Sequence, residues 1–134
     1  VLWEKSPERR PALAMGLATT LAGFLTSLDA SGRIVGDPLV GYVAEYLANF
    51  GLTEFVVNLH HQPDSVIEAL GDGSRFGVHI DYTREEPKIL GTAGALDNAR
   101  HLLEDDTFLI ANGKIITDID ISAALETFEA SRAP

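Results

Sequence analysis

The sequence predicts a single α/β domain of three layers (α/β/α), in which helices cover both faces of a Rossmann-like, mostly parallel sheet. Short apolar runs of strand length alternate with longer segments whose apolar residues recur at helical spacing. The connections are long enough for the crossovers that parallel strands require. No repeat, low-complexity tract or linker divides the 134 residues, a length that suits one domain.

Short apolar segments are predicted to form about four strands, at residues 12–15, 54–59, 77–82 and 107–111. Glu54–Leu59 is short, apolar and β-branched, which is typical of a buried strand. In Gly77–Tyr82 apolar residues alternate with polar ones, so Val78, Ile80 and Tyr82 share one face.

Helices are predicted from Pro38 onward and over residues 65–70, 92–103 and 121–130. Asp120 is expected to cap the last of them. The first carries an apolar stripe formed by Leu39, Tyr42, Val43, Tyr46 and Leu47.

The chain is acidic, with 20 Asp and Glu against 10 Lys and Arg and a net charge of −10. It repels phosphate backbones and anionic lipids at long range, so we expect neither nucleic acid nor a membrane as a partner. The absence of Cys excludes disulfides and thiolate metal sites.

The uncharged stretch from Pro11 to Leu28 follows Arg9 and Arg10 and superficially resembles a signal peptide. Thr and Ser residues dilute it, and no clean cleavage site follows. We prefer a buried strand followed by a loop and a helix, and we expect a cytoplasmic protein.

Two glycine-bearing turns stand where such a sheet binds ligands. They are Gly16–Leu21, after the first apolar run, and Leu90–Leu96, at the start of a helix. A helix N-terminus offers unpaired N–H groups and the positive end of the helix dipole to an anion. Taken alone, a glycine-bearing turn is more often simple backbone punctuation than a ligand site.

Together with their neighbours, these turns resemble the sugar-phosphate nucleotidylyltransferases, the pyrophosphorylases that make nucleotide-activated sugars, including mannose-1-phosphate guanylyltransferases. The matching segments are 37–43, 53–60, 71–77, 90–96 and 112–120, in the family's order and spacing. The match covers about the first half of the family's catalytic domain, so we expect residues 1–134 to form one domain that is truncated on its C-terminal side.

The resemblance implies a transferase that joins a nucleoside triphosphate to a sugar-1-phosphate with Mg²⁺ and releases pyrophosphate. It implies nucleotide-binding roles for Gly16, Thr19, Gly91, Thr92, Ala93, Gly94 and Asn112. In the family the first turn wraps the triphosphate, and the turn matching Leu90–Leu96 contacts the base and ribose.

The first turn departs from the family pattern Gly-x-Gly-Thr-Arg-Leu. Its second Gly is Ala18 and its Arg is Thr20, which supplies neither the charge nor the forked donors of a phosphate clamp. The Lys expected upstream of Asp37 is also missing, and Arg33 is out of register with it.

The family's Asn-Gly-Asp triplet reads Asn112-Gly113-Lys114 here. An ammonium therefore replaces a Mg²⁺-binding carboxylate, which puts Mg²⁺ binding in doubt. Lys114 either neutralises a bound phosphate in place of the metal or is simply solvated at the sheet edge.

Other polar residues have simpler interpretations. His60 and His61 are adjacent at a strand end and diverge, so we expect a structural turn rather than a shared metal. Glu85 and Glu86 are expected to be solvated charges on an exposed loop rather than an acid/base pair.

Two functions remain open. The first is a catalytically impaired pseudoenzyme that binds a nucleotide or sugar phosphate, or that has a regulatory role. We assign no catalytic residue in this sequence. The alternative is an active nucleotidylyltransferase completed by a longer chain or a partner subunit. Half a family domain leaves a sheet edge uncovered, so we also expect self-association or a partner chain.

Overall fold

The computed structural model of the chain describes residues 13–16, 38–103, 107–113 and 115–131. Its sheet consists of β1 (Leu13–Gly16), β2 (Glu54–Leu59), β3 (His79–Arg84) and β4 (Ile110–Ala111). The strand order is β3-β2-β1-β4, and every pair of neighbours is parallel. The predicted α/β fold with a parallel sheet is therefore confirmed.

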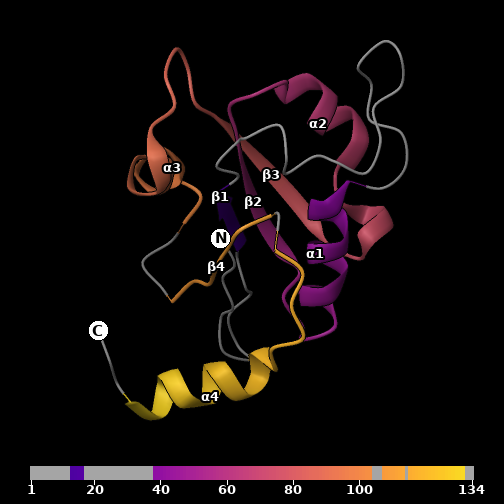
Figure 1. Cartoon of the computed structure of the whole chain (residues 1–134), viewed down its shortest axis with the longest axis vertical. Coiled ribbons are helices and arrows are strands. Elements are labelled where there is room, and N and C mark those ends of the chain that lie inside the picture. Colours follow the sequence, from indigo (N-terminus) through magenta and orange to yellow (C-terminus); the bar gives the residue numbers. More distant parts are fainter. Residues whose placement is uncertain (1–12, 17–37, 104–106, 114, 132–134) are drawn as a thin grey trace.

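Helices cover both faces of this sheet (Figure 1). The helices α1 (Leu39–Ala48) and α2 (Pro63–Leu70) lie on one face, together with the short 3₁₀ helix η2 (Ser74–Phe76). The helix α3 (Gly91–Ala99) lies on the other face, against β1 and β2. The three predicted layers are thus present.

The side chains of β2 alternate between the two layers of helices. Phe55, Val57 and Leu59 are buried in the main core with α1 and α2. Val56 points to the opposite face, where it packs with Ala99 and Leu103 in a second cluster. Because side chains alternate along a strand, Asn58 lies on the same face as Val56, toward α3.

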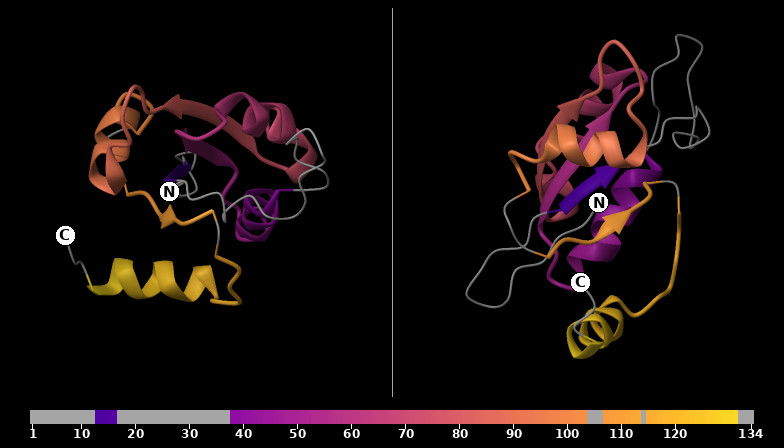
Figure 2. Two further views of the ribbon diagram at one scale, coloured as in Figure 1. Left: turned by 45° about the horizontal axis from the view of Figure 1, so that its top comes forward. Right: turned by 90° about the vertical axis from the view of Figure 1, so that its left-hand side faces the viewer.

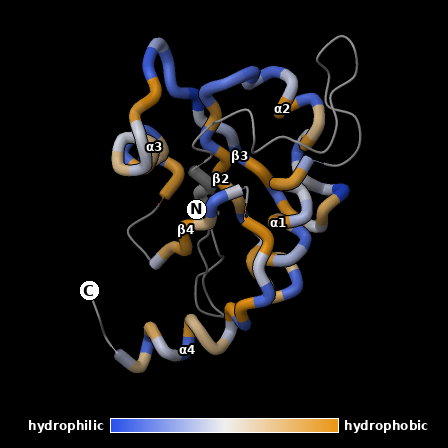
Figure 3. The backbone as a smooth tube through the Cα atoms, in the orientation of Figure 1, coloured by the Kyte–Doolittle hydropathy of each residue, from blue (hydrophilic) through white to orange (hydrophobic). Residues whose placement is uncertain are grey.

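The last helix, α4 (Ile121–Ser131), lies apart from the sheet (Figure 2). Of its residues Ile121 is buried, and Leu125 packs partly against the main core. Figure 3 shows mixed hydropathy along α4, in contrast to the hydrophobic strands at the centre. Within the described residues, no helix is long and apolar enough to cross a membrane.

Several predicted boundaries are corrected. The helix predicted over 92–103 is α3 and ends at Ala99, although Leu102 and Leu103 continue the apolar side. The strand predicted over 107–111 pairs only at Ile110 and Ala111, opposite Ala14 and Met15 of the short β1. The strand predicted over 77–82 is shifted to His79–Arg84.

The stripe predicted on the first helix is also corrected. Its buried apolar side chains include Val40, Val43, Ala44 and Leu47, whereas Tyr42 remains 49% exposed. The buried face is therefore rotated toward Val40 and Ala44, because the small Ala44 and the close approach at Gly41 bring α1 against Phe76.

Candidate functional site

The carboxyl ends of the strands bring the first predicted residues together. Gly16 ends β1 and is in register with Asn58 of β2, which is in register with Thr83 of β3. Asn112 directly follows β4, whose Ala111 pairs with Met15. These residues form one edge of the sheet, the edge at which parallel α/β sheets bind ligands.

The turn from Leu90 to Gly94 begins α3 above the face of β1 and β2. Leu90 has right-handed backbone angles (φ −94°, ψ −11°), and Gly91 follows with a left-handed φ of +69°. In general, a right-handed residue followed by a left-handed one is the backbone geometry that directs consecutive N–H groups toward an anionic or carbonyl oxygen. Gly91, Thr92 and Ala93 are exposed, and Gly94 is half-buried.

A buried polar network lies beneath this turn. Asn58, Thr83 and Glu85 are 4%, 6% and 3% exposed. The Thr83 hydroxyl donates to Asn58 Oδ1 (3.0 Å), and Asn58 Nδ2 donates to Glu85 Oε1. The second oxygen of Glu85, Oε2, accepts the backbone N–H of Leu90. The network therefore joins β2 and β3 to the start of α3.

The expectation that Glu85 is solvated is wrong. Its neighbour Glu86 is exposed as predicted, but Glu85 continues the inward alternation of Thr83 and is held by the network. Its backbone N–H also donates to the Leu59 carbonyl (2.7 Å). A period of two from Thr83 to Glu85 was the available sequence signal, and the paired glutamates concealed it.

His60 takes the structural position that the sequence predicts. Its Nδ1 lies 2.9 Å from the Glu85 carbonyl oxygen. The Asn98 amide also reaches this connection and donates to the Arg84 carbonyl (3.0 Å). The segment leading into the turn is therefore tied to both β2 and α3.

An apolar cavity of about 400 Å³ lies on the other side of the sheet edge, between α1, β4 and the segment before α4. Asn112 lines it, whereas none of Gly91, Thr92, Ala93 and Gly94 does. Its other walls include Tyr42, Tyr46, Ile110, Ile115 and Ile119. Asn112 thus lines a cavity to which the α3 turn does not contribute. Thr19 and Lys114 lie outside the described residues.

The rim of this cavity is held by α1 and the entry to α4. The Tyr46 hydroxyl donates to the Ile119 carbonyl. Burial, followed by the charges of Asp118 and Asp120, raises the pKa of Tyr46 above its ordinary value. Asp120 Oδ1 accepts the Ala123 N–H (3.0 Å), so its predicted role as a helix cap is confirmed.

Residues 112–114 follow β4 and are the triplet on which the expectation for Mg²⁺ rests. The triplet supplies one amide oxygen from Asn112 and an ammonium from Lys114, and a hard cation needs several oxygen ligands. Among the described residues, no three His, Cys, Asp or Glu side chains are grouped to hold a metal ion.

Comparison with known proteins agrees with this geometry. Residues 33–134 match the family model described as nucleotidyl transferase. The chain is 42% identical over 94 residues to N-acetylmuramate alpha-1-phosphate uridylyltransferase of Neisseria meningitidis, covering 70% of this chain and 41% of that protein. It is 31% identical over 99 residues to mannose-1-phosphate guanylyltransferase of Mycobacterium tuberculosis, covering 73% of this chain and 27% of that protein.

A solved structure shares the fold. The crystal structure of HddC from Yersinia pseudotuberculosis, complexed with GMP-PN, superimposes with a TM-score of 0.67 at 24% identity. The match covers 87% of this chain and 53% of that one. The chain therefore spans only part of the length of the relatives it matches.

Proposed function

Because the chain belongs to the nucleotidyl transferase family, we propose that it binds a nucleotide at the α3 turn and that it is catalytically impaired on its own. It is a nucleotidyltransferase domain related to the sugar-1-phosphate nucleotidylyltransferases. The ligand is a nucleoside triphosphate or a nucleotide-sugar, and uridine, guanosine and thymidine compounds are the first to test because the relatives carry those names.

The geometry of the α3 turn carries this proposal. The left-handed Gly91 opens the turn, Gly91 to Ala93 are accessible, and the turn lies against β1 and β2 at the carboxyl edge. Backbone N–H groups in such a turn recognise carbonyl and hydroxyl oxygens of a base and ribose without any charged side chain.

The impairment follows from the chemistry of three positions. Thr20 lacks the guanidinium of a phosphate clamp, the upstream Lys is missing, and Lys114 stands in place of a carboxylate. Phosphoryl transfer depends on neutralising developing charge, and each such group is worth about 10²–10³ in rate. Their joint loss favours binding or regulation over turnover.

Chemical-shift mapping by NMR tests where the ligand binds. Titration with uridine, guanosine and thymidine, and then with UTP, GTP and dTTP, is expected to shift the amide signals of Gly91 to Gly94 most. Shifts confined to residues around the α1 cavity, such as Tyr42 and Ile119, would contradict binding at the α3 turn.

A second candidate is an active nucleotidylyltransferase completed by further sequence or a partner subunit. The 42% identity to a uridylyltransferase favours it, because that relative is more than twice as long as the matched region. Transfer by this chain, when supplied with the C-terminal part of that relative, would support this candidate; continued inactivity would support impairment.

We also propose that the chain self-associates through its apolar face. The face consists of Tyr42, Ile110, Ile115, Ile116 and Ile119, with exposures between 48% and 75%. Within the described sheet β4 is an edge strand, and an uncovered edge beside exposed apolar side chains favours pairing with a second copy of the chain. Sedimentation of Ile116→Glu is expected to show more monomer than wild type, and monomer alone in both would contradict it.

A further inference from the structure

Glu85 carries a buried carboxylate, and both of its oxygens accept hydrogen bonds from uncharged donors. It is 3% exposed, and its two oxygens accept from the Asn58 amide and from the Leu90 N–H. Burial of a carboxylate is costly unless hydrogen bonds replace its hydration. A residue of this kind therefore needs a local structural reason to be retained.

The reason lies in the position of the Leu90 N–H. The first N–H groups of a helix have no acceptor within the helix, and the helix dipole places partial positive charge there. Glu85 supplies both an acceptor and a negative charge at the first turn of α3. An anion belonging to the protein therefore already stands where a ligand's phosphate would be attracted.

The same carboxylate is fixed from below. Thr83 orients the Asn58 amide, and Asn58 orients Glu85. Asn58 is in register with Gly16, the last residue of β1. One chain of hydrogen bonds thus fixes the position of the α3 turn relative to the carboxyl ends of β1 and β2.

We propose that Glu85 is a positioning residue, which holds the α3 turn in its binding geometry and, by neutralising the start of α3, makes the turn select the uncharged nucleoside part of a nucleotide. The selectivity rests on the nucleotide binding proposed above. The positioning does not, since it concerns the turn of the free protein.

The first test is amide hydrogen exchange in the ligand-free chain. The Leu90 N–H of the wild type is expected to exchange at least about tenfold more slowly than the amides of Thr92 and Ala93 in the same exposed turn, because it is bonded to a charged acceptor. Glu85→Gln should remove about tenfold or more of that protection. Glu86→Gln is the matched control, since it removes the same charge from an exposed neighbour and should leave Leu90 protected.

The second test is the ratio of affinities for uridine and UTP, measured by calorimetry without Mg²⁺. Glu85→Gln is expected to shift the ratio toward UTP by about two- to fivefold, because the helix N-terminus regains its attraction for anions. Glu86→Gln changes the net charge equally and should shift it much less. A purely structural role would lower both affinities together and leave the ratio unchanged.

The outcomes separate this proposal from the proposed function. Equal ratios in the two variants would overturn the selectivity, and a wild-type Leu90 amide that exchanges as fast as those of Thr92 and Ala93 would overturn the positioning. If Glu85→Gln fails to fold, the wild-type exchange measurement still decides the positioning. If the wild type binds no nucleoside or nucleotide, the proposed function fails and the selectivity with it, while the exchange test stands.

Discussion

Gly94 lies so close to Leu90 that a Cβ atom on Gly94 would stand 2.5 Å from the Leu90 Cβ atom. Gly91, three residues earlier, has nothing within 4 Å of such an atom and instead needs its left-handed φ of +69°. The two glycines of the α3 turn are therefore required for different reasons, one steric and one conformational.

Replacing Gly94 by Ala should displace the turn. Overpacking costs about 1–3 kcal/mol, which exceeds the gain of about 1 kcal/mol in helix propensity. We expect a lower free energy of unfolding in urea and weaker nucleotide binding. The double variant Leu90→Gly/Gly94→Ala removes the opposing Cβ atom and should recover part of both. Additive effects in this cycle would show that the contact is not the cause.

Replacing Asn58 by Ala should be more damaging than its size implies. The change leaves Glu85 Oε1 buried without its donor, and the unfolding free energy is expected to fall by about 3 kcal/mol. Thr83→Val removes only the outer hydrogen bond of the network and should cost about 1 kcal/mol. Urea unfolding of the two variants measures the difference. Equal losses would contradict a network organised around the carboxylate.

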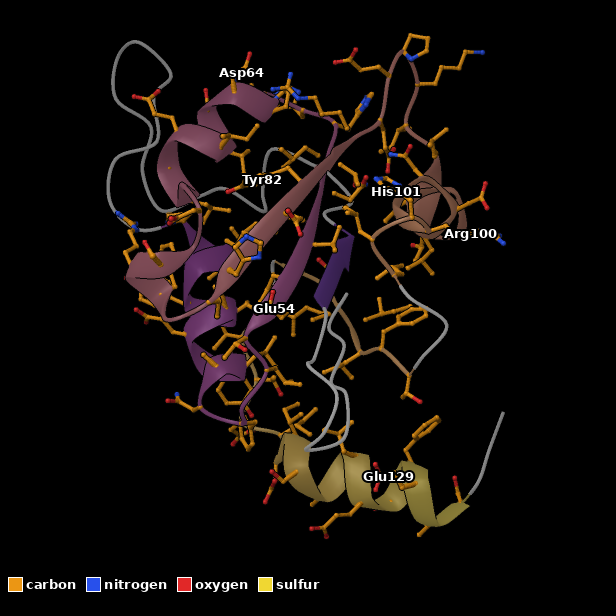
Figure 4. The ribbon with its side chains drawn as sticks, turned by 180° about the vertical axis from the view of Figure 1, so that it is seen from behind. Glu54, Asp64, Tyr82, Arg100, His101 and Glu129 are labelled. Atoms are coloured by element: carbon orange, nitrogen blue, oxygen red, sulfur yellow. The ribbon has the colours of Figure 1, made fainter. Side chains whose placement is uncertain are left out.

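Ionisation of the Tyr82 hydroxyl should lower the free energy of unfolding in strongly alkaline solution. Its hydroxyl donates to the Gly71 carbonyl (2.6 Å), linking β3 to the end of α2, and Figure 4 shows it on β3 beside this helix. Burial, assisted by the charge of Asp72, raises the pKa of Tyr82 to about 12.

Because the folded pKa lies above the unfolded value of about 10, the contribution is complete below about pH 10 and is lost as pH rises toward about 12. Tyr82→Phe should be less stable at neutral pH by about 1 kcal/mol and lose less stability over the alkaline range. Denaturant unfolding across that range measures both. Identical alkaline slopes for variant and wild type would contradict this role of Tyr82.

Replacing Lys114 by Asp should restore some dependence of nucleotide binding on Mg²⁺. The change supplies the carboxylate that the family pattern carries after Asn112-Gly113. Turnover is not expected, because Thr20 still lacks the phosphate clamp. Lys114→Asn is the control, since it removes the ammonium without adding a ligand of equal charge. Equal Mg²⁺ responses in the two variants would show that charge removal alone is responsible.

Local sequence patterns predicted the presence of helices and strands better than the residues at which they begin and end. Glu54–Leu59 is a strand with the expected bounds, because a short apolar run flanked by breaks has few other uses. Leu102 and Leu103 kept helical spacing, yet the N–H of Leu102 bonds to the third residue back rather than the fourth. Spacing reports which side is buried and not which carbonyl accepts, so the end of α3 was mispredicted.

The residues of the site were harder to predict than the helices and strands, because they depend more on tertiary contacts. The glycines of the α3 turn were recognisable from the sequence, since a turn before a helix restricts the residue types allowed. Glu85 was not, because its partners Asn58 and Leu90 come from β2 and from the far end of the connection. Asn112 lines the apolar cavity beside α1, to which the α3 turn does not contribute, and this too depends on tertiary packing that the linear order does not specify.

We propose that a nucleotide binds at the α3 turn without needing Mg²⁺. Isothermal titration calorimetry of the wild-type chain with UTP, GTP and dTTP, each with and without Mg²⁺, tests it most directly. We expect weak binding of at least one nucleotide, an affinity that Mg²⁺ leaves nearly unchanged, and loss of the signal in Gly94→Ala. Binding that requires Mg²⁺, accompanied by release of pyrophosphate when a sugar-1-phosphate is added, would contradict it.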